Sequence, residues 1–166
     1  MEIKSTISNA DGSMTELIYS DAETFDNLPR EKVKQAYGVC FFEDKMLIVF
    51  NSKRKAWGLV GGSLEPGETF EECLKREVAE ESNMRVLNFY PIGVQAVYAP
   101  QKDVIYQLRY ACIIEPIGLF VADPAEGAIT EIKLINPDSY KEYFDWGDIG
   151  DRIIKRGVEL KSSLVI

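Results

Sequence analysis

Residues 61–84 read GGSLEPGETFEECLKREVAEESNM, and this stretch decides how the rest of the chain is interpreted. It holds seven glutamates against one lysine and one arginine. Thr69 followed by Glu72 is typical of a capping box, which begins a helix. Asn83 stands where a left-handed residue often ends one. The sequence therefore predicts a helix over Thr69–Ser82.

Acidic side chains continue the apolar face of this predicted helix. At 100° per residue, an apolar stripe begins the helix at Phe70, Cys73 and Leu74. One and two turns later the stripe is occupied by Glu77 and Glu81, with Glu80 just beside it, so that three carboxylates share one face of the helix. A solvated acidic face is the usual interpretation of a glutamate-rich helix. Here the acids lie where solvent is least available, and they repel one another unless a cation neutralises them.

Oxygen ligands alone favour a hard divalent cation, so the stripe predicts a site for Mg²⁺ or Mn²⁺ rather than zinc. Arg76 lies four residues before Glu80 and eight after Glu68. At these spacings it can brace a carboxylate and hold the geometry of the cluster.

The 166 residues suffice for one domain, and we expect a single domain over 1–166 with its core at about 33–150. Residues 1–30 read as a polar lead-in, with a possible hairpin between Glu2–Ser8 and Met14–Ser20. Strands and two further helices are expected at Ala36–Phe42, Lys45–Asn51, Arg85–Tyr90, Ile92–Tyr98, Val104–Glu115, Glu131–Ile135, Ser139–Phe144 and Ile149–Val158. This order predicts an α+β fold with a mixed sheet covered by helices.

The balance of charge excludes several classes of protein. Nineteen Lys and Arg against 27 Asp and Glu give a net charge of −8. A general binder of nucleic-acid polymers or of membrane surfaces needs a basic face, so neither role is expected. No apolar stretch is long enough to span a bilayer, and the N-terminus lacks the pattern of a secretory signal. We therefore expect a cytoplasmic protein.

Cysteine and histidine usage narrows the chemistry. Cys40, Cys73 and Cys112 lie among apolar neighbours and are expected to be buried thiols in a reducing compartment. Histidine is absent, which excludes Ser-His-Asp and Cys-His catalysis and most zinc sites. Acid–base and metal chemistry must therefore come from carboxylates, Lys, Tyr or Cys.

The spacing of the charged residues resembles the Nudix box of the Nudix hydrolases. That motif reads Gly-x5-Glu-x7-Arg-Glu-U-x-Glu-Glu-x-Gly-U, where U is a bulky apolar residue. Gly62, Glu68 and the run from Arg76 to Glu81 match it at every charged position. Two positions depart from the pattern: Asn83 replaces the last glycine, and Val60 stands where many members have proline. The resemblance implies an α/β/α sandwich with a mixed central sheet.

The resemblance also implies an activity, the hydrolysis of a pyrophosphate bond in a nucleoside diphosphate linked to X. Such enzymes use Mg²⁺ or Mn²⁺, which here would supply the positive field that an acidic protein lacks. By position in the motif, the implied metal ligands are Glu77, Glu80, Glu81 and the carbonyl of Gly61. Glu68 and Arg76 would brace them.

The general base is left open by the motif. Glu77 or Glu81 could serve while bound to metal. Some members use a further glutamate from a loop before a late strand, and Glu126 is the best-placed candidate here. A solvated loop acid is the alternative interpretation of Glu126.

Three residues are candidates for substrate binding: Arg54, Trp57 and Arg109. Arg54 could contact a phosphate or lie at a solvated hairpin end. Trp57 could stack on a base or pack in the core. Arg109 shares a strand face with Gln107, and this face looks either into a pocket or into solvent.

A nucleoside triphosphate or related nucleotide is the favoured substrate because the chain is compact. A nucleotide sugar such as ADP-ribose is the second choice, and a non-catalytic module that binds a nucleotide or sugar as a regulator is the alternative class. The expected partner is a small-molecule nucleotide, and the protein is expected to be a monomer or a homodimer.

Overall fold

The structure, a computed structural model, describes residues 2–122 and 127–164. Its strands are β1 (Glu2–Ser8), β2 (Met14–Asp21), β3 (Val33–Phe42), β4 (Lys45–Asn51), β5 (Ala56–Gly58), β6 (Val60–Ser63), β7 (Met84–Tyr98), β8 (Ile105–Pro116) and β9 (Ile129–Ile135). Its helices are α1 (Phe70–Ser82) and α2 (Gly147–Lys161), with short 3₁₀ turns η1 (Arg30–Lys32), η2 (Pro137–Glu142) and η3 (Ser162–Leu164).

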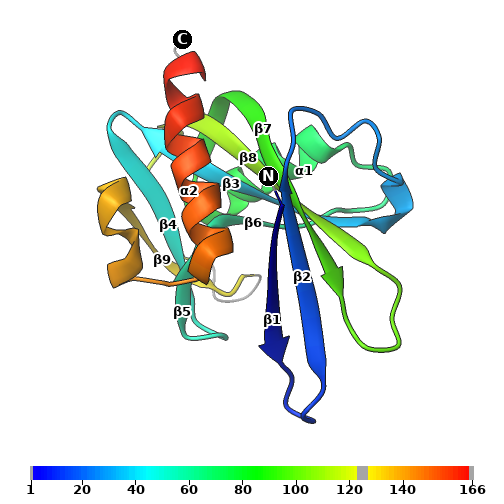
Figure 1. The fold of residues 1–166 in the computed structure, drawn as a ribbon. Helices are drawn as coiled ribbons and strands as arrows, with labels where there is room; N and C mark the ends of the chain where they lie inside the picture. The colour runs from blue at the N-terminus through cyan, green and yellow to red at the C-terminus, as the bar shows by residue number, and fades with distance from the viewer. Residues whose placement is uncertain (1, 123–126, 165–166) are drawn as a thin grey trace.

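In the described residues the strands form one mixed sheet in the order β1-β2-β7-β8-β3-β4-β5 (Figure 1). β6 pairs with β3, and β9 pairs with β4. β3 and β8 run parallel, and the other pairs are antiparallel. The N-terminal strands pair as a hairpin, and β2 continues the sheet beside β7. Residues 2–21 are therefore part of the sheet, which their polar composition did not indicate.

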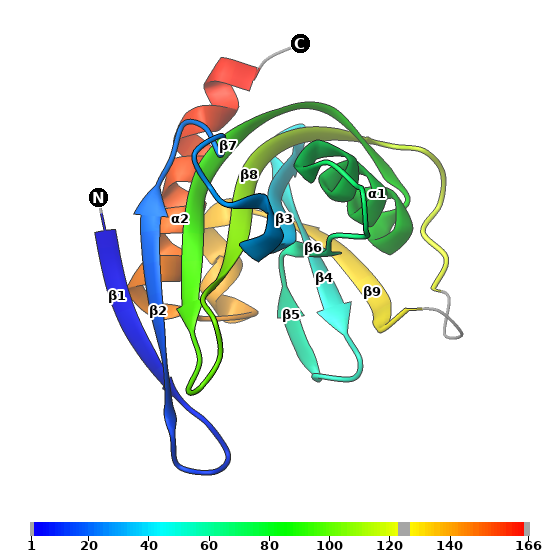
Figure 2. The same ribbon diagram turned by 90° about the vertical axis from the view of Figure 1, so that its right-hand side faces the viewer.

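The two helices cover opposite faces of this sheet (Figure 2). α1 buries Cys73, Leu74 and Val78 against one face, and α2 buries Ile149 and Ile153 against the other. Alternate residues of the central strands supply the two cores because successive side chains of a strand point to opposite faces. The predicted α+β sandwich with a mixed sheet is confirmed.

Helix α1 begins and ends as its sequence predicts. The Thr69 hydroxyl accepts a hydrogen bond from the Glu72 amide at 3.1 Å, and the Glu72 carboxylate accepts one from the Thr69 amide. Asn83 takes the left-handed conformation with φ 55°, so it serves where the motif has glycine. Its side-chain amide also donates to the Leu119 carbonyl at 2.9 Å.

Several expected elements differ from the structure. Residues 84–98 form one strand rather than two, because shifts of register at Val86/Asn88 and Pro91/Gly93 absorb the proline without ending the pairing. The expected helix over 139–144 is the 3₁₀ turn η2, in which Asn136 caps a segment with proline at its start. α2 extends beyond the predicted 149–158 at both ends.

The three cysteines are free and buried, as predicted. Among the described residues, neither helix has the length and apolar character needed to cross a membrane.

Candidate functional site

Two glycines of β6, Gly61 and Gly62, lie between β3 and the acidic side chains of α1. Gly61 has φ 151°, and a Cβ there would lie 2.3 Å from the Ala36 carbonyl oxygen. A Cβ on Gly62 would lie 2.6 Å from the carboxyl carbon of Glu77. Only glycine therefore lets this strand lie so close to β3 on one side and to the acids of α1 on the other.

The Glu81 carboxylate joins α1 to this strand. Its Oε1 atom accepts a hydrogen bond from the Gly61 amide at 2.8 Å. The pKa of Glu81 is raised to about 7, chiefly by burial and also by the charges of Glu77 and Glu80, while the Gly61 hydrogen bond opposes the rise. Burial also raises the pKa of Glu77, against the opposing effect of Arg76. A carboxyl with a raised pKa inside a cleft is typical of a functional site.

Arg76 is the hub that orients the acids. Its guanidinium grips both oxygens of Glu68, with Nε–Oε2 at 2.6 Å and Nη2–Oε1 at 2.9 Å. Nη1 donates to Glu77 at 2.9 Å and to Glu80 at 3.2 Å, and Nη2 donates to the Ser63 carbonyl. Arg76 holds the pKa of Glu68 down at about 2. The two hydrogen bonds between Arg76 and Glu68 thus connect the loop before α1 to the middle turn of this helix.

The three glutamates of the stripe do not all face one point. Glu77 and Glu81 face the two glycines, whereas the Glu80 side chain is 60% exposed and turned to Arg76. Among the residues that the structure describes, no three His, Cys, Asp or Glu side chains converge as a metal centre. The donor set still fits a hard divalent cation, because it consists of oxygen atoms and the charge of Glu80 raises the pKa of both Glu77 and Glu81.

Beside these acids lies a cleft of about 790 Å³. Glu81, Gly61 and Gly62 line one part of it, and residues of β1, β2, β3, β4, β5, β7, β8, β9 and the start of α2 line much of the rest. A volume of this size is typical of small-molecule sites. All three candidate substrate-binding residues line this cleft: Arg54, Trp57 and Arg109.

Trp57 both packs and lines the cleft. Its ring meets Phe50 and Tyr143 edge-on, with centroids 5.3 and 5.8 Å apart, and the Lys133 ammonium lies over it at 5.4 Å. These contacts fix the ring while it stays only partly buried. The two interpretations of Trp57, core packing and a site wall, are thus compatible.

Arg109 and Gln107 share one face of β8, and both line the cleft. Farther along β8, the same face of the sheet packs against α2. Arg109 is 6% exposed, and its guanidinium lies 4.8 Å from the centre of the Tyr37 ring. Sequence reasoning missed Gln35 and Gln95, which line the cleft beside Gln107. Only the register of β3, β7 and β8 brings these side chains together, and the sequence carried no signal of that register.

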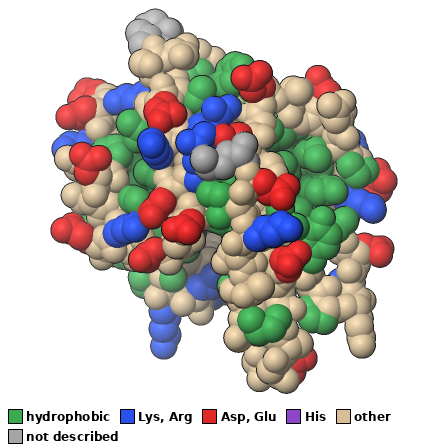
Figure 3. Space-filling view, viewed as in Figure 1, with side chains coloured by type: hydrophobic (Ala, Val, Ile, Leu, Met, Phe, Trp, Pro, Cys, Tyr) green, Lys and Arg blue, Asp and Glu red, His purple; other side chains and the backbone are tan. Residues whose placement is uncertain are grey.

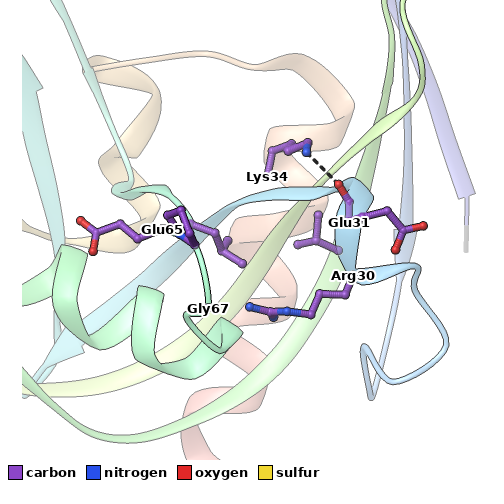
Figure 4. A pocket seen from close by; sticks show the side chains of 8 residues that line it. Arg30, Glu31, Lys34, Glu65 and Gly67 are labelled. Carbon is purple, nitrogen blue, oxygen red and sulfur yellow. Dashed lines mark hydrogen bonds between the residues drawn. The ribbon is translucent and has the colours of Figure 1, made fainter.

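A second hollow, of about 490 Å³, lies between η1 and the loop before α1 (Figure 4). Its cations already have partners, since Lys34 donates to the Glu31 carbonyl at 2.7 Å and Arg30 donates to the Glu68 carbonyl. Neither Glu77 nor Glu81 lines it. The first cleft is therefore the candidate active site. The proposed loop base, Glu126, lies outside the described residues.

The face in Figure 3 carries acidic and basic side chains intermixed, and its described part shows no continuous basic surface. This agrees with the net charge of −8.

Comparison with known proteins decides the family. The family model described as the NUDIX domain matches residues 32–156. The chain belongs to the Nudix family. The matched region contains the two glycines, the Arg76 hub and every described cleft residue except those of the N-terminal hairpin.

Individual relatives of this Nudix protein are distant. It is 31% identical over 91 residues to the putative 8-oxo-dGTP diphosphatase YtkD of Bacillus subtilis, a match over 54% of this chain and 57% of that protein. It is 57% identical over 30 residues to the nucleoside triphosphatase NudI of an Enterobacter species, over 18% of this chain and 21% of that one. These matches thus span less than two thirds of either relative.

Solved structures share the fold. The Bacillus subtilis pyrophosphohydrolase BsRppH (E68A mutant) superposes with a TM-score of 0.69 at 18% identity, over 97% of this chain and 99% of that one. The MutT protein of Bacillus halodurans gives a TM-score of 0.56 at 23% identity, over 73% and 78%. The first superposition includes the N-terminal hairpin, because it spans nearly the whole of this chain.

Proposed function

We propose that this Nudix protein is a pyrophosphohydrolase that cleaves a phosphoanhydride bond in a nucleoside diphosphate linked to X, with a nucleoside triphosphate or related nucleotide as its substrate. The observation that carries the proposal is the pair of carboxylates, Glu77 and Glu81, held against Gly61 and Gly62 beside a cleft of nucleotide size. The names of YtkD, NudI and BsRppH, which refer to nucleotides or to pyrophosphate hydrolysis, support it.

Glu77, Glu80, Glu81 and the Gly61 carbonyl are the proposed ligands of Mg²⁺ or Mn²⁺. When bound, the cation would supply the positive charge that phosphates need beside an acidic protein. Glu80 needs only a rotation of its exposed side chain away from Arg76, and this solvent-exposed ion pair costs little to break. Arg76 would keep Glu77 and Glu68 in place through its remaining hydrogen bonds.

The chain's own groups also account for proton transfer. As water bonds to phosphorus, the bridging oxygen leaves with the electron pair of the broken bond, and a carboxylate accepts the proton of the water. Glu81 is the first proposed base because its carboxylate lines the cleft and is held in place by the Gly61 amide at 2.8 Å. Glu77 and Glu126 are the other proposed candidates for the base.

Arg54, Trp57 and Arg109 are the proposed contacts to the rest of the substrate. Arg54 is exposed at the turn before β5 and supplies a cation for a phosphate, and Trp57 supplies a fixed aromatic wall. The substrate is a small molecule rather than a nucleic-acid polymer, in keeping with the acidic chain. Three free buried thiols agree with a cytoplasmic location.

The test is a panel of nucleoside triphosphates and ADP-ribose incubated with Mg²⁺, with Mn²⁺ or with EDTA, followed by chromatography of the products. We expect a nucleoside triphosphate to be cleaved only with metal. Glu71→Gln is the matched control, because Glu71 is an exposed acid of the same helix, and it should keep full activity. Preferential cleavage of ADP-ribose would assign the nucleotide-sugar alternative, and binding without cleavage would assign the regulatory one.

A further inference from the structure

Three glutamines form a continuous row across the floor of the cleft. Gln95 on β7 is paired in register with Gln107 on β8, and Gln107 is paired with Gln35 on β3. The Gln95 amide donates to Gln107 Oε1 at 2.9 Å, and the Gln107 amide donates to Gln35 Oε1. Three aligned amides on neighbouring strands are costly to desolvate unless each has partners. The floor is therefore built around fixed hydrogen bonds.

Arg109 lies beside this row with its charge uncompensated. In the described part of the chain it has no carboxylate partner, and its Nε atom is the buried side-chain atom without a hydrogen bond. Its other contacts are long, with Nη2 to Gln107 Oε1 at 3.3 Å and Nη1 to the Leu108 carbonyl at 3.4 Å. An arginine that is 94% buried, has no ion-pair partner and leaves Nε without a hydrogen bond is costly, so the geometry points to a ligand that supplies an acceptor.

The hydrogen bonds of this row also determine which polar atoms remain available to a ligand. Gln107 Oε1 accepts from both Gln95 and Arg109, so the Gln107 amide cannot turn over without losing these contacts. Arg109 Nε is left as a donor. Among the described residues, no donor reaches the side-chain oxygen of Gln95, which is left as an acceptor. The two side chains meet at Gln107 Oε1, so the donor of Arg109 and the acceptor of Gln95 belong to groups that contact the same atom. A donor and an acceptor in this arrangement complement a lactam, in which a carbonyl adjoins a ring N–H.

Apolar side chains lie next to this floor. Leu17 of β2 and Ile7 of β1 line the cleft beyond Gln95, and Trp146, which is 41% exposed, lines it from the start of α2. Apolar and aromatic surfaces stack on a planar base, whereas a phosphate gains nothing from them. The phosphates are better placed near Glu81 and Gly61. Tyr37 on β3 is paired with Gly61 on one side and with Arg109 on the other, so one strand separates this position from Arg109.

We propose that Arg109, held by Gln107 and flanked by Gln95, reads the lactam edge of a 6-oxopurine base. This inference rests on the proposed function and deepens it by naming the base. Arg109 Nε donates to the 6-oxo group and Gln95 Oε1 accepts from N1–H. Adenine reverses both groups, since it carries an amino group at position 6 and an acceptor at N1. A site with buried groups of fixed polarity rejects such an analogue strongly.

The test compares kcat/KM for ITP and ATP, which differ only at this edge. We expect ITP to be preferred by at least about tenfold. Gln107→Glu should reduce the preference to less than about threefold, because a carboxylate would pair with Arg109 and remove its free donor. Arg109→Met should do the same by deleting the donor. Gln101→Glu makes the same change of charge on an exposed turn and should keep the preference.

Equal kcat/KM for ITP and ATP would overturn the inference, and so would a preference that survives both substitutions. The inference would also be overturned if the wild-type protein showed no preference between the two bases and Arg109→Met bound pyrophosphate more weakly. Arg109 would then be assigned to the phosphates of the substrate. Binding of IMP and AMP by calorimetry tests the floor without hydrolysis, with a Kd expected to be at least about tenfold lower for IMP. If neither triphosphate were cleaved, the proposed function would fail. The comparison of IMP and AMP binding would still decide whether the site prefers a 6-oxopurine.

Discussion

The Glu81 carboxylate accepts a hydrogen bond from the Gly61 amide at 2.8 Å, across twenty residues of chain. This contact places a helix acid from one face of the sheet beside the cleft on the other face. It also buries a carboxyl that has no arginine partner among the described residues, and this burial is the main reason why its pKa rises to about 7. The buried position of Glu81 therefore destabilises the metal-free protein when this carboxyl is ionised, although the Gly61 hydrogen bond offsets part of the cost.

We predict that Glu81→Gln stabilises the metal-free protein at pH 8. The folded pKa of about 7 exceeds the ordinary value of 4.5, so Glu81 favours folding below pH 4.5 and loses this contribution as pH rises to 7. Glutamine keeps an acceptor for the Gly61 amide and carries no charge. Urea melts in EDTA should give the variant at least about 1 kcal/mol more stability at pH 8 and less advantage at pH 5. A variant less stable than wild type at pH 8 would contradict the burial argument.

We predict that Gly62→Ala lowers activity more than stability. The added Cβ would lie within 2.8 Å of both oxygens of Glu77 and would push this carboxylate out of place. The obstacle is the end of a side chain, so the fold can adjust at a cost of about 1–2 kcal/mol. Activity should fall at least about tenfold, since Glu77 is a proposed metal ligand and catalysis depends on the position of such a group. Gly67→Ala is the control for a loss of stability that displaces no acid, because a Cβ there meets nothing within 4 Å while the φ of 80° disfavours alanine; it should lower stability and keep activity.

We predict that the Arg76–Glu68 pair gives the protein acid sensitivity. Arg76 lowers the pKa of Glu68 from 4.5 to about 2, so the pair stabilises the fold above pH 4.5 and this contribution is lost as pH falls toward 2. Glu68→Gln should cost about 1–3 kcal/mol at pH 7. The difference from wild type should shrink at the lowest pH where both proteins unfold reversibly. A difference independent of pH would show that packing rather than charge accounts for the loss.

We predict that Arg109→Met raises the melting temperature. The substitution removes a buried charge that lacks an ion-pair partner in the described residues, and the flexible methionine side chain fills the inner part of the space without polar groups. An increase of about 2–4 °C corresponds to about 1 kcal/mol in a chain of this size. Calorimetry of wild type and variant provides the measurement. A lower melting temperature would mean that the Tyr37 contact and the long hydrogen bonds already compensate the charge.

The elements around the acidic helix could be predicted because local residues determine them. Thr69, Glu72 and Asn83 fix the two ends of α1 through short-range hydrogen bonds and backbone preference. The continuous strand β7 could not be predicted, because Pro91 is normally incompatible with a strand and only pairing with β8 holds it in place.

The candidate site was predictable on the helix and unpredictable on the sheet. Spacing along α1 brought the glutamates and Arg76 together, but it gave no warning that Glu80 turns away to Arg76. The row of Gln35, Gln95 and Gln107 depends on the register of three strands that lie far apart in sequence. Alternation along a strand shows which of its residues share a face of the sheet. Only the pairing of strands in the folded protein determines which residues of the adjacent strands lie next to them.

The most direct test of the central claim is kcat of Glu81→Gln with saturating Mg²⁺, beside Glu71→Gln and wild type. Because Glu81 is both a proposed metal ligand and a proposed proton acceptor, we expect kcat to fall at least about 100-fold, with a folded protein shown by an unchanged or higher melting temperature. Glu71→Gln should retain the wild-type value. A Glu81→Gln protein whose kcat stays within about tenfold of wild type would contradict the assignment of this acid to the catalytic centre.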